Sequence, residues 1–181
     1  AAPAAMKIST QSRGAAGDRS AMDHVFSPWR YTYVASRREG DGCVLCRIGA
    51  GEAVSDEESL VLARGEHHFV VLNRFPYNSG HLMIVPYLHA ARLADLDPAV
   101  LAEMGRLAAR AEGALVDAYR PDGVNLGMNL GKAAGAGIED HLHLHVVPRW
   151  DGDTNFMTVA GETRVLPEGL GETWRKLRGR L

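Results

Sequence analysis

The sequence predicts an α+β fold, in which one long helix crosses an antiparallel sheet. Apolar runs of strand length outnumber the helical patterns along the 181 residues. Most neighbouring strand candidates are joined by loops of hairpin length, which favours antiparallel pairing. A single long amphipathic pattern separates the early strand candidates from the late ones, as a crossover helix would.

Composition is that of a soluble globular domain and excludes several classes of partner. Hydrophobic residues make up 46% of the chain and charged residues 23%, which is ordinary for a folded domain. The 20 basic and 22 acidic residues leave a formal charge of -2, so no overall attraction to nucleic acid or an anionic membrane is expected. No apolar run approaches the roughly 18 residues of a membrane span. We therefore expect a cytoplasmic protein that binds neither nucleic acid nor membrane.

The first 21 residues differ from the rest of the chain. They are rich in Ala, Ser and Gly and lack the apolar core of a signal peptide. We expect residues 1–21 to form a flexible tail and residues 22–181 to form a single domain. The aromatic-rich stretch MDHVFSPWRYTYV opens that domain as an arm, and a turn is expected at GDGCVLC, residues 40–46.

The middle of the chain predicts three strands and then the long helix. The strands are expected at residues 59–63, 69–73 and 81–85, with RFPYNSG (74–80) as a hairpin loop. Asp97 is the expected N-cap of the helix, and Pro98 suits its first position. RPDG, at 120–123, ends the helix. Its apolar stripe recurs at helical spacing: Val100, Met104, Leu107, Ala111, Leu115 and Ala118.

Two more strands are expected after the helix. VNLGMNL (124–130) alternates between apolar and polar residues, as a strand with two different faces does. The Gly- and Ala-rich loop GKAAGAG (131–137) then leads to HLHLHVV (141–147), in which three histidines occupy alternate positions and so share one face. A hairpin around residues 160–162 and a short basic helix complete the chain.

Three histidines on one strand face require a functional explanation. Burying three imidazoles without partners would cost several kcal/mol, at about 1–3 kcal/mol for each unsatisfied group. Alternate residues lie about 6.6–6.8 Å apart, so two neighbouring imidazoles can share one zinc but three cannot without a bend in the strand. At least one histidine therefore remains for catalysis, and a neutral imidazole can attack phosphorus to form a phosphoramidate.

The loop before the histidines can supply donors for phosphate oxygens. Small side chains at residues 131–137 let backbone N–H groups approach an anion closely. The loop is not a Walker A motif, because Gly131-Lys132 is followed by Ala133 and no helix is expected after it.

HLHLHVV matches the His-x-His-x-His-x-x pattern, with apolar x, of the histidine-triad (HIT) nucleotide-binding superfamily. NRFPYNSGHLMIVPYLH (73–89) and NLGMNLG (125–131) also resemble segments of that family, so the resemblance covers residue 22 to the end. It implies a HIT-like antiparallel sheet of about five strands with the long crossover helix and a short C-terminal helix, usually joined across a twofold axis into a homodimer.

The resemblance also implies roles for individual residues. His143, the middle histidine, would be the nucleophile, while His141 and His145 would orient it and help to bind phosphate. Asn73 falls where the family places a ribose-hydroxyl ligand, and Asn129 falls where a side-chain amide reaches the active site.

One departure from the family concerns phosphate binding. Many relatives carry Gln followed by Ser or Thr just before the triad, and Gly137 and Ile138 occupy those places here. Phosphate contacts are therefore expected from backbone N–H groups of the loop, including Gly137, with Lys132 adding positive charge unless it is simply a solvated loop residue. AGAGIEDHLHLHVVPRW, with FSPWRYTYV, is similar to a bacterial branch of diadenosine tetraphosphate phosphorylases. Trp150 marks that branch and could stack on a nucleobase, although core packing explains it equally well.

The only two cysteines, Cys43 and Cys46, have the spacing of a zinc half-site. A thioredoxin-like redox pair is one alternative, but that motif closes a strand and opens a helix, and EGDGCVLCRIGAGE (39–52) shows neither pattern. Two idle buried thiols are another. The resemblance suggests His89 and His141 as the remaining ligands of a structural zinc, which leaves His143 free.

Three activities are compatible with these residues. The first is a nucleotidyl transferase that is adenylylated on His143 by a dinucleoside polyphosphate and then transfers the adenylyl group to inorganic phosphate, giving ADP and ATP from diadenosine tetraphosphate. The second is a hydrolase of dinucleoside polyphosphates or nucleoside phosphoramidates, with water as the acceptor. The third is a zinc-stabilised regulatory module that binds nucleotides with little turnover.

Overall fold

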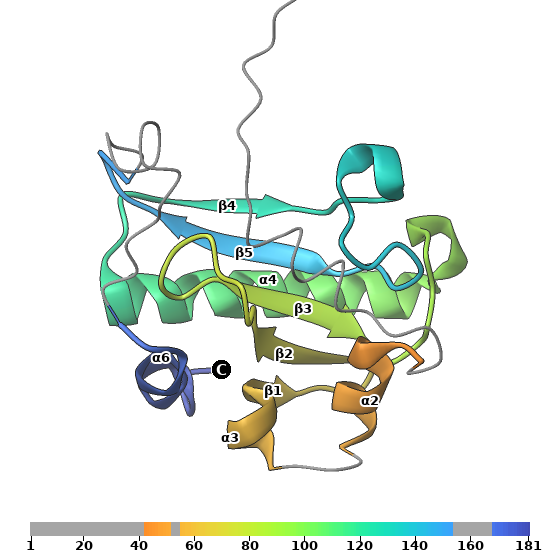
Figure 1. Cartoon of the computed structure of the whole chain (residues 1–181), viewed down its shortest axis with the longest axis horizontal. Helices are drawn as coiled ribbons and strands as arrows, with labels where there is room; N and C mark the ends of the chain where they lie inside the picture. Colours follow the sequence, from red (N-terminus) through yellow and green to blue (C-terminus); the bar gives the residue numbers. More distant parts are fainter. Residues whose placement is uncertain (1–41, 52–54, 154–167) are drawn as a thin grey trace, which may run out of the picture.

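The computed structural model describes residues 42–51, 55–153 and 168–181, and its centre is a five-stranded sheet. The strands lie in the order β1-β2-β3-β5-β4, and every neighbouring pair is antiparallel, so the predicted fold class is confirmed. Figure 1 shows β1 and β4 at the two edges of the sheet. The strand bounds are β1 Val61–Arg64, β2 His68–Leu72, β3 Leu82–Pro86, β4 Gly123–Gly127 and β5 Leu144–Arg149.

Helix α4 (Pro98–Tyr119) is the predicted crossover helix and lies along one face of the sheet (Figure 1). Pro98 occupies its first turn, as expected, and Arg120 ends it in the left-handed conformation with φ of 47°. The predicted stripe faces the sheet: its four central members are buried, and the two outer ones are partly buried. No helix among the described residues is long and apolar enough to cross a membrane.

The opposite face of the sheet is partly covered by helix α2 (Val44–Ala50). The turn expected at residues 40–46 is wrong from Cys43 onward, because Cys43 is the N-cap of this helix and Cys46 lies within it; residues 40 and 41 lie outside the described part of the chain. Leu45 packs into a second apolar cluster with Phe69, Val71 and Val85. This tertiary contact stabilises a helix of seven residues, which is too short to be stable alone.

A second short helix, α3 (Asp56–Ser59), precedes the first strand. Strand β1 therefore begins later than the strand expected at 59–63, because Ser59 ends the helix and Leu60 turns the chain at φ of 64°. Ser55 and Glu58 form a reciprocal capping box that stabilises this helix. The signal S-x-x-E was present in the sequence, but the run of β-type residues after it obscured the boundary.

Strand β5 also begins later than predicted, at Leu144 instead of residue 141. The backbone N–H of Leu142 donates to the carbonyl of Ala90, at 2.8 Å, so the chain before Leu144 is held by the loop that follows β3. His141 and His143 therefore lie just outside the regular ladder.

Helix α6 (Leu170–Leu177) confirms the short C-terminal helix and packs against α4 and β1 (Figure 1). Trp174 anchors it by donating its indole N–H to the carbonyl of Val61 at 2.8 Å. The tail at 1–21, the aromatic arm and the hairpin expected around 160–162 lie outside the described residues.

Candidate functional site

His143 and His145 line a cavity of about 460 Å³ at the start of β5. Helix α2 supplies one wall through Val44, Leu45 and Ile48, and helix α3, strands β2 and β3 and the loops after β2 and β4 supply the rest of the lining. Most of this surface is apolar, which suits a flat, poorly charged group such as a nucleobase. The predicted site residues among the lining are Asn73, Asn129, Gly137, His143 and His145.

The backbone fixes the tautomer of His143. Its Nδ1 lies 3.0 Å from the carbonyl oxygen of His141, and a carbonyl can only accept, so Nδ1 carries the proton. The lone pair of the neutral ring is therefore on Nε2. Burial lowers the pKa of His143 below its ordinary value, which keeps the ring neutral near physiological pH. A neutral imidazole with a free Nε2 lone pair is the form that can attack phosphorus.

A second chain of hydrogen bonds fixes the tautomer of His145. The backbone N–H of Tyr77 donates to Nδ1 of His81 at 3.0 Å, so a neutral His81 carries its proton on Nε2. That Nε2 lies 3.0 Å from Nδ1 of His145 and donates to it. Neutral His145 must then hold its own proton on Nε2. The site thus places a lone pair on one histidine and a proton on the next, with ring centroids 4.8 Å apart.

His81 belongs to the candidate site through its hydrogen bond to His145, and the sequence did not predict it. It is only 1% exposed, and its ring stacks on Tyr77 with a centroid distance of 4.7 Å. The sequence signal was weak, because it showed only that His81 opens the expected third strand and shares a face with Met83. In the structure, Met83 pairs with His145 across β3 and β5. Only the register between these two strands brings His81 to the triad, and that register is not readable from the sequence.

His141 differs from the other two histidines because its ring turns away from the cavity. Its Nε2 donates to the carbonyl of Pro86 at 2.8 Å, so Nδ1 bears the lone pair. That Nδ1 lies 3.3 Å from Sγ of Cys43 and 3.4 Å from Sγ of Cys46. The contact of His141 with His143 is made by its backbone carbonyl and not by its imidazole.

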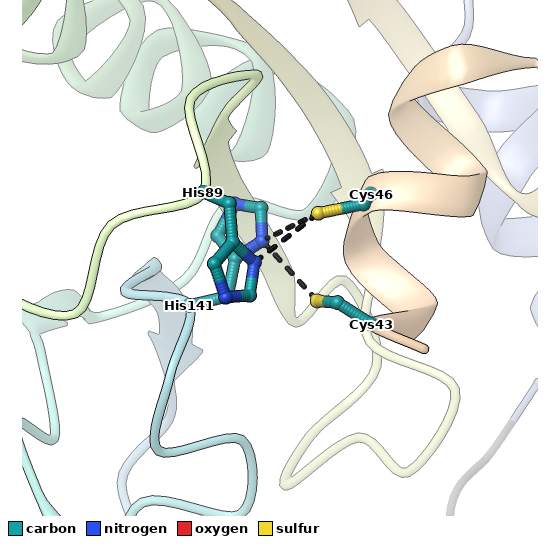
Figure 2. Close-up of side chains that lie close together, drawn as sticks. All are labelled: Cys43, Cys46, His89 and His141. Atoms are coloured by element: carbon teal, nitrogen blue, oxygen red, sulfur yellow. Dashed lines mark hydrogen bonds between the residues drawn. The ribbon is translucent and has the colours of Figure 1, made fainter. Parts of the chain in front are cut away.

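Figure 2 shows that the side chains of Cys43, Cys46, His89 and His141 converge. Their four ligand atoms all lie within 4.8 Å of one another, and Nδ1 of His89 is 3.2 Å from Sγ of Cys46. Tetrahedral zinc, with ordinary bond lengths, would hold sulfur and nitrogen ligands about 3.5 Å apart. The predicted ligand set is therefore close enough to bind a metal ion, and the proton on His141 lies on the nitrogen that faces away from the cluster.

Two predicted substrate contacts lie away from this cavity. Lys132 is exposed on the short helix η2 (Lys132–Ala134), between β4 and β5. Trp150 follows the end of β5, with its ring edge-on to Tyr119 at a centroid distance of 6.4 Å. Neither residue lines the cavity beside His143. The structure thus gives Trp150 a packing contact within the chain and leaves its contact with a nucleobase as a prediction.

Fewer backbone N–H groups of the glycine-rich loop (131–137) are available to phosphate than its composition indicates. The N–H groups of Ala134, Gly135 and Ala136 all donate to carbonyls of Gly131 or Lys132 within the loop. They are therefore occupied in shaping the loop. Gly137, which follows them and lines the cavity, remains a suitable backbone donor for phosphate.

Comparison with known proteins adds independent information. The HIT domain model matches residues 54–152. AP-4-A phosphorylase from Mycobacterium tuberculosis is 40% identical over 166 residues, which cover 89% of this chain and 85% of that protein. Adenylylsulfatase HINT3 from Arabidopsis thaliana is 31% identical over 148 residues, which cover 82% of this chain and 66% of that protein.

A solved structure resembles the fold. It is the crystal structure of a Zn-bound histidine triad family protein from Mycobacterium smegmatis, which matches with a TM-score of 0.63 and 32% identity. The match covers 77% of this chain and 92% of that one.

Proposed function

The chain belongs to the HIT domain family, and on that premise we propose that it is a nucleotidyltransferase that cleaves diadenosine tetraphosphate with inorganic phosphate to give ADP and ATP. The observation that carries the proposal is the pair of fixed proton positions. His143 offers a lone pair and His145 offers a proton at one cavity that is large enough for a nucleoside.

In the first step, Nε2 of His143 attacks the phosphorus next to one adenosine and forms an N–P bond. The P–O bond to the rest of the substrate breaks, and its electron pair leaves with an oxygen of ATP. The proton on Nε2 of His145 passes to that departing oxygen. The apolar wall of α2 holds the adenine, Asn73 lies at the lining for the ribose hydroxyls, and the N–H of Gly137 serves the phosphate.

In the second step, an oxygen of inorganic phosphate attacks the phosphorus of the adenylyl-histidine. The N–P bond breaks, its electron pair returns to Nε2 of His143, and His145 recovers its proton from the attacking phosphate. ADP is the product, and both histidines end in the tautomers in which they began. Division into two displacements makes each barrier lower than that of a single transfer.

We assign phosphate as the acceptor because of the 40% identity to AP-4-A phosphorylase, which the chain matches along most of its length. The experiment is product analysis of diadenosine tetraphosphate turnover with and without phosphate. ADP and ATP should form, at a rate that rises and saturates with phosphate. AMP and ATP in phosphate-rich buffer would identify a hydrolase instead, and nucleotide binding without turnover would identify a regulatory module. His67→Ala, on the turn between β1 and β2 and outside the cavity lining, is a matched histidine control that should keep full activity.

The proposal includes a structural zinc held by Cys43, Cys46, His89 and His141. Two thiolates and two imidazoles in tetrahedral reach are the donor set that zinc favours, and the solved relative from M. smegmatis is Zn-bound. Such closed sites contribute to folding and leave no open position for substrate. Metal analysis of freshly purified protein should find about one zinc per chain.

We also propose that the chain forms a homodimer across a twofold axis. Strand β4 lies at the edge of the sheet and presents Leu126 with 54% of its surface exposed. An exposed apolar edge strand favours pairing with a second copy. Light scattering coupled to gel filtration should give twice the chain mass, and a monomer would contradict this part of the proposal.

A further inference from the structure

The floor of the cavity beside His143 runs across the strands of the sheet. Met83 pairs with His145 across β3 and β5, and Val71 pairs with Met83 across β2 and β3. Residues that pair directly share one face of a sheet, and all three of these line the cavity. The cavity therefore extends along this face from the histidines toward the edge strand β1.

Helix α3 lies at the far end of this cavity. It packs against β1 (Figure 1), and its residues Glu58 and Ser59 belong to the lining. Three strand spacings separate β5 from β1, which amounts to about 14 Å at the usual spacing. That span is comparable with the length of a nucleoside monophosphate. A phosphate group at His143 therefore places the base near α3, with the apolar wall of α2 beside it.

The carboxylate of Glu58 is oriented by the cap of its own helix. Its Oε2 accepts from the backbone N–H of Ser55 at 3.0 Å and from the hydroxyl of Ser55 at 3.1 Å. These bonds belong to the capping box of α3. No group in the described part of the chain donates to Oε1 of Glu58. This oxygen can therefore accept a hydrogen bond from a ligand in the cavity.

Purine bases differ at position 6, where a carboxylate oxygen can distinguish between them. Adenine has an amino group there, which donates, whereas guanine has an oxo group, which accepts. Hypoxanthine has the same oxo group as guanine. Because a carboxylate oxygen can only accept, Oε1 of Glu58 attracts the amino group and repels the oxo group. The apolar side chains of α2 contact the flat faces of all three bases alike, so selection depends on this edge.

We propose that Glu58 selects the nucleoside by accepting a hydrogen bond from the 6-amino group of adenine. This inference rests on the proposed function and adds to it the residue that decides which base is carried with the transferred phosphate. Arg74 is the other charged side chain of the described lining, and it follows Asn73, the proposed ribose contact, in the loop after β2. A guanidinium that contacted the base edge would favour an oxo group, so the two side chains predict opposite preferences.

The test is Glu58→Gln, with the binding of AMP and IMP measured by calorimetry. Glutamine also forms capping boxes, so its amide oxygen should accept both bonds from Ser55 and turn the NH2 group toward the cavity. The wild type should bind AMP at least about fivefold more tightly than IMP, a modest ratio because Glu58 is also accessible to water. In Glu58→Gln the preference should invert, because the NH2 group donates to the oxo oxygen of IMP.

Turnover provides a second measurement of the same preference. Adenosine 5′-phosphoramidate and inosine 5′-phosphoramidate both release ammonia and differ only in the base. The ratio of their kcat/KM values should therefore follow the ratio of the two binding constants in each variant. Glu58→Ala should remove the preference without inverting it, because alanine neither accepts nor donates.

Glu57→Gln is the matched control, because Glu57 precedes Glu58 on α3 and has the same charge but lies outside the cavity lining. It should keep the wild-type preference, and both glutamine variants should keep the wild-type melting temperature. An unchanged ratio in Glu58→Gln, a wild-type preference for IMP, or no binding of either nucleotide would overturn the inference. A wild type that prefers AMP but does not cleave diadenosine tetraphosphate would refute the proposed function and leave the inference in place.

Discussion

His81 is the residue whose replacement most directly tests how the site fixes its protons. In His81→Phe the ring can keep its stacking on Tyr77, but both nitrogens are lost. The backbone N–H of Tyr77 then lacks the acceptor it had at 3.0 Å, and Nδ1 of His145 lacks the donor it had at 3.0 Å. Neutral His145 can then place its proton on either nitrogen, so the proton donor is no longer always in place.

The size of the effect follows from those two hydrogen bonds. Each buried polar group that loses its partner costs about 1–3 kcal/mol. If the cost at His145 appears fully in the transition state, the rate falls by about 5- to 150-fold, since about 1.4 kcal/mol is tenfold. The cost at the N–H of Tyr77 appears separately, as a lower free energy of unfolding.

The assay compares leaving groups that need a proton to different degrees. Ammonia leaves adenosine 5′-phosphoramidate only after protonation, whereas fluoride leaves adenosine 5′-phosphofluoridate without it. His81→Phe should therefore slow the phosphoramidate far more than the phosphofluoridate. His81→Gln, whose amide can both accept from Tyr77 and donate to His145, should recover part of the rate. Equal slowing of both substrates would refute the reasoning and leave His81 with a packing role only.

Three further predictions concern the proposed nucleophile, the proposed metal site and the buried pair of His68 and Glu103 on the other side of the sheet. His143→Ala should abolish the adenylyl adduct that mass spectrometry detects on the acid-quenched wild-type protein, with little change in melting temperature; an adduct on another residue would contradict the assignment. Cys46→Ser should lower both the metal content and the melting temperature, and chelation of the wild type should do the same. His68 is fully buried, with Nδ1 2.8 Å from the Glu103 carboxylate, and burial lowers its pKa. The unfolded chain then binds the proton more readily than the folded one, so the free energy of unfolding should fall as pH drops below about 6.5. Urea titrations of His68→Phe should show a smaller fall over the same pH range.

Some of this structure could be predicted because local patterns carry it. The stripe from Val100 to Ala118 defines one face of α4, and Pro98 marks its start regardless of what the helix packs against. The convergence of Cys43 and Cys46 with His89 and His141 was also expected, from the resemblance to HIT proteins.

Other features depend on contacts between distant residues and could not be read from local patterns. Helix α2 is stabilised by packing of Leu45 against Phe69 and Val71, and a pattern of seven residues does not show this. Likewise, the role of His81 comes from the pairing of β3 with β5. Strand β5 starts late because the loop after β3 competes for the backbone before Leu144, which no periodicity in HLHLHVV could indicate.

His141 makes two different contacts, one through its imidazole and one through its backbone carbonyl. This affects how specific activities should be compared between purified batches of the protein. The imidazole of His141 is one of the four side chains that converge, while its carbonyl accepts from the ring of His143, so the metal that we propose would also restrain the proposed nucleophile two residues away. If attack requires that restraint, purified batches that differ in metal occupancy should be mixtures of competent and incompetent molecules. The amplitude of the pre-steady-state burst counts the competent ones, and rates divided by that amplitude should agree between batches. Rates divided by total protein should follow the metal content instead.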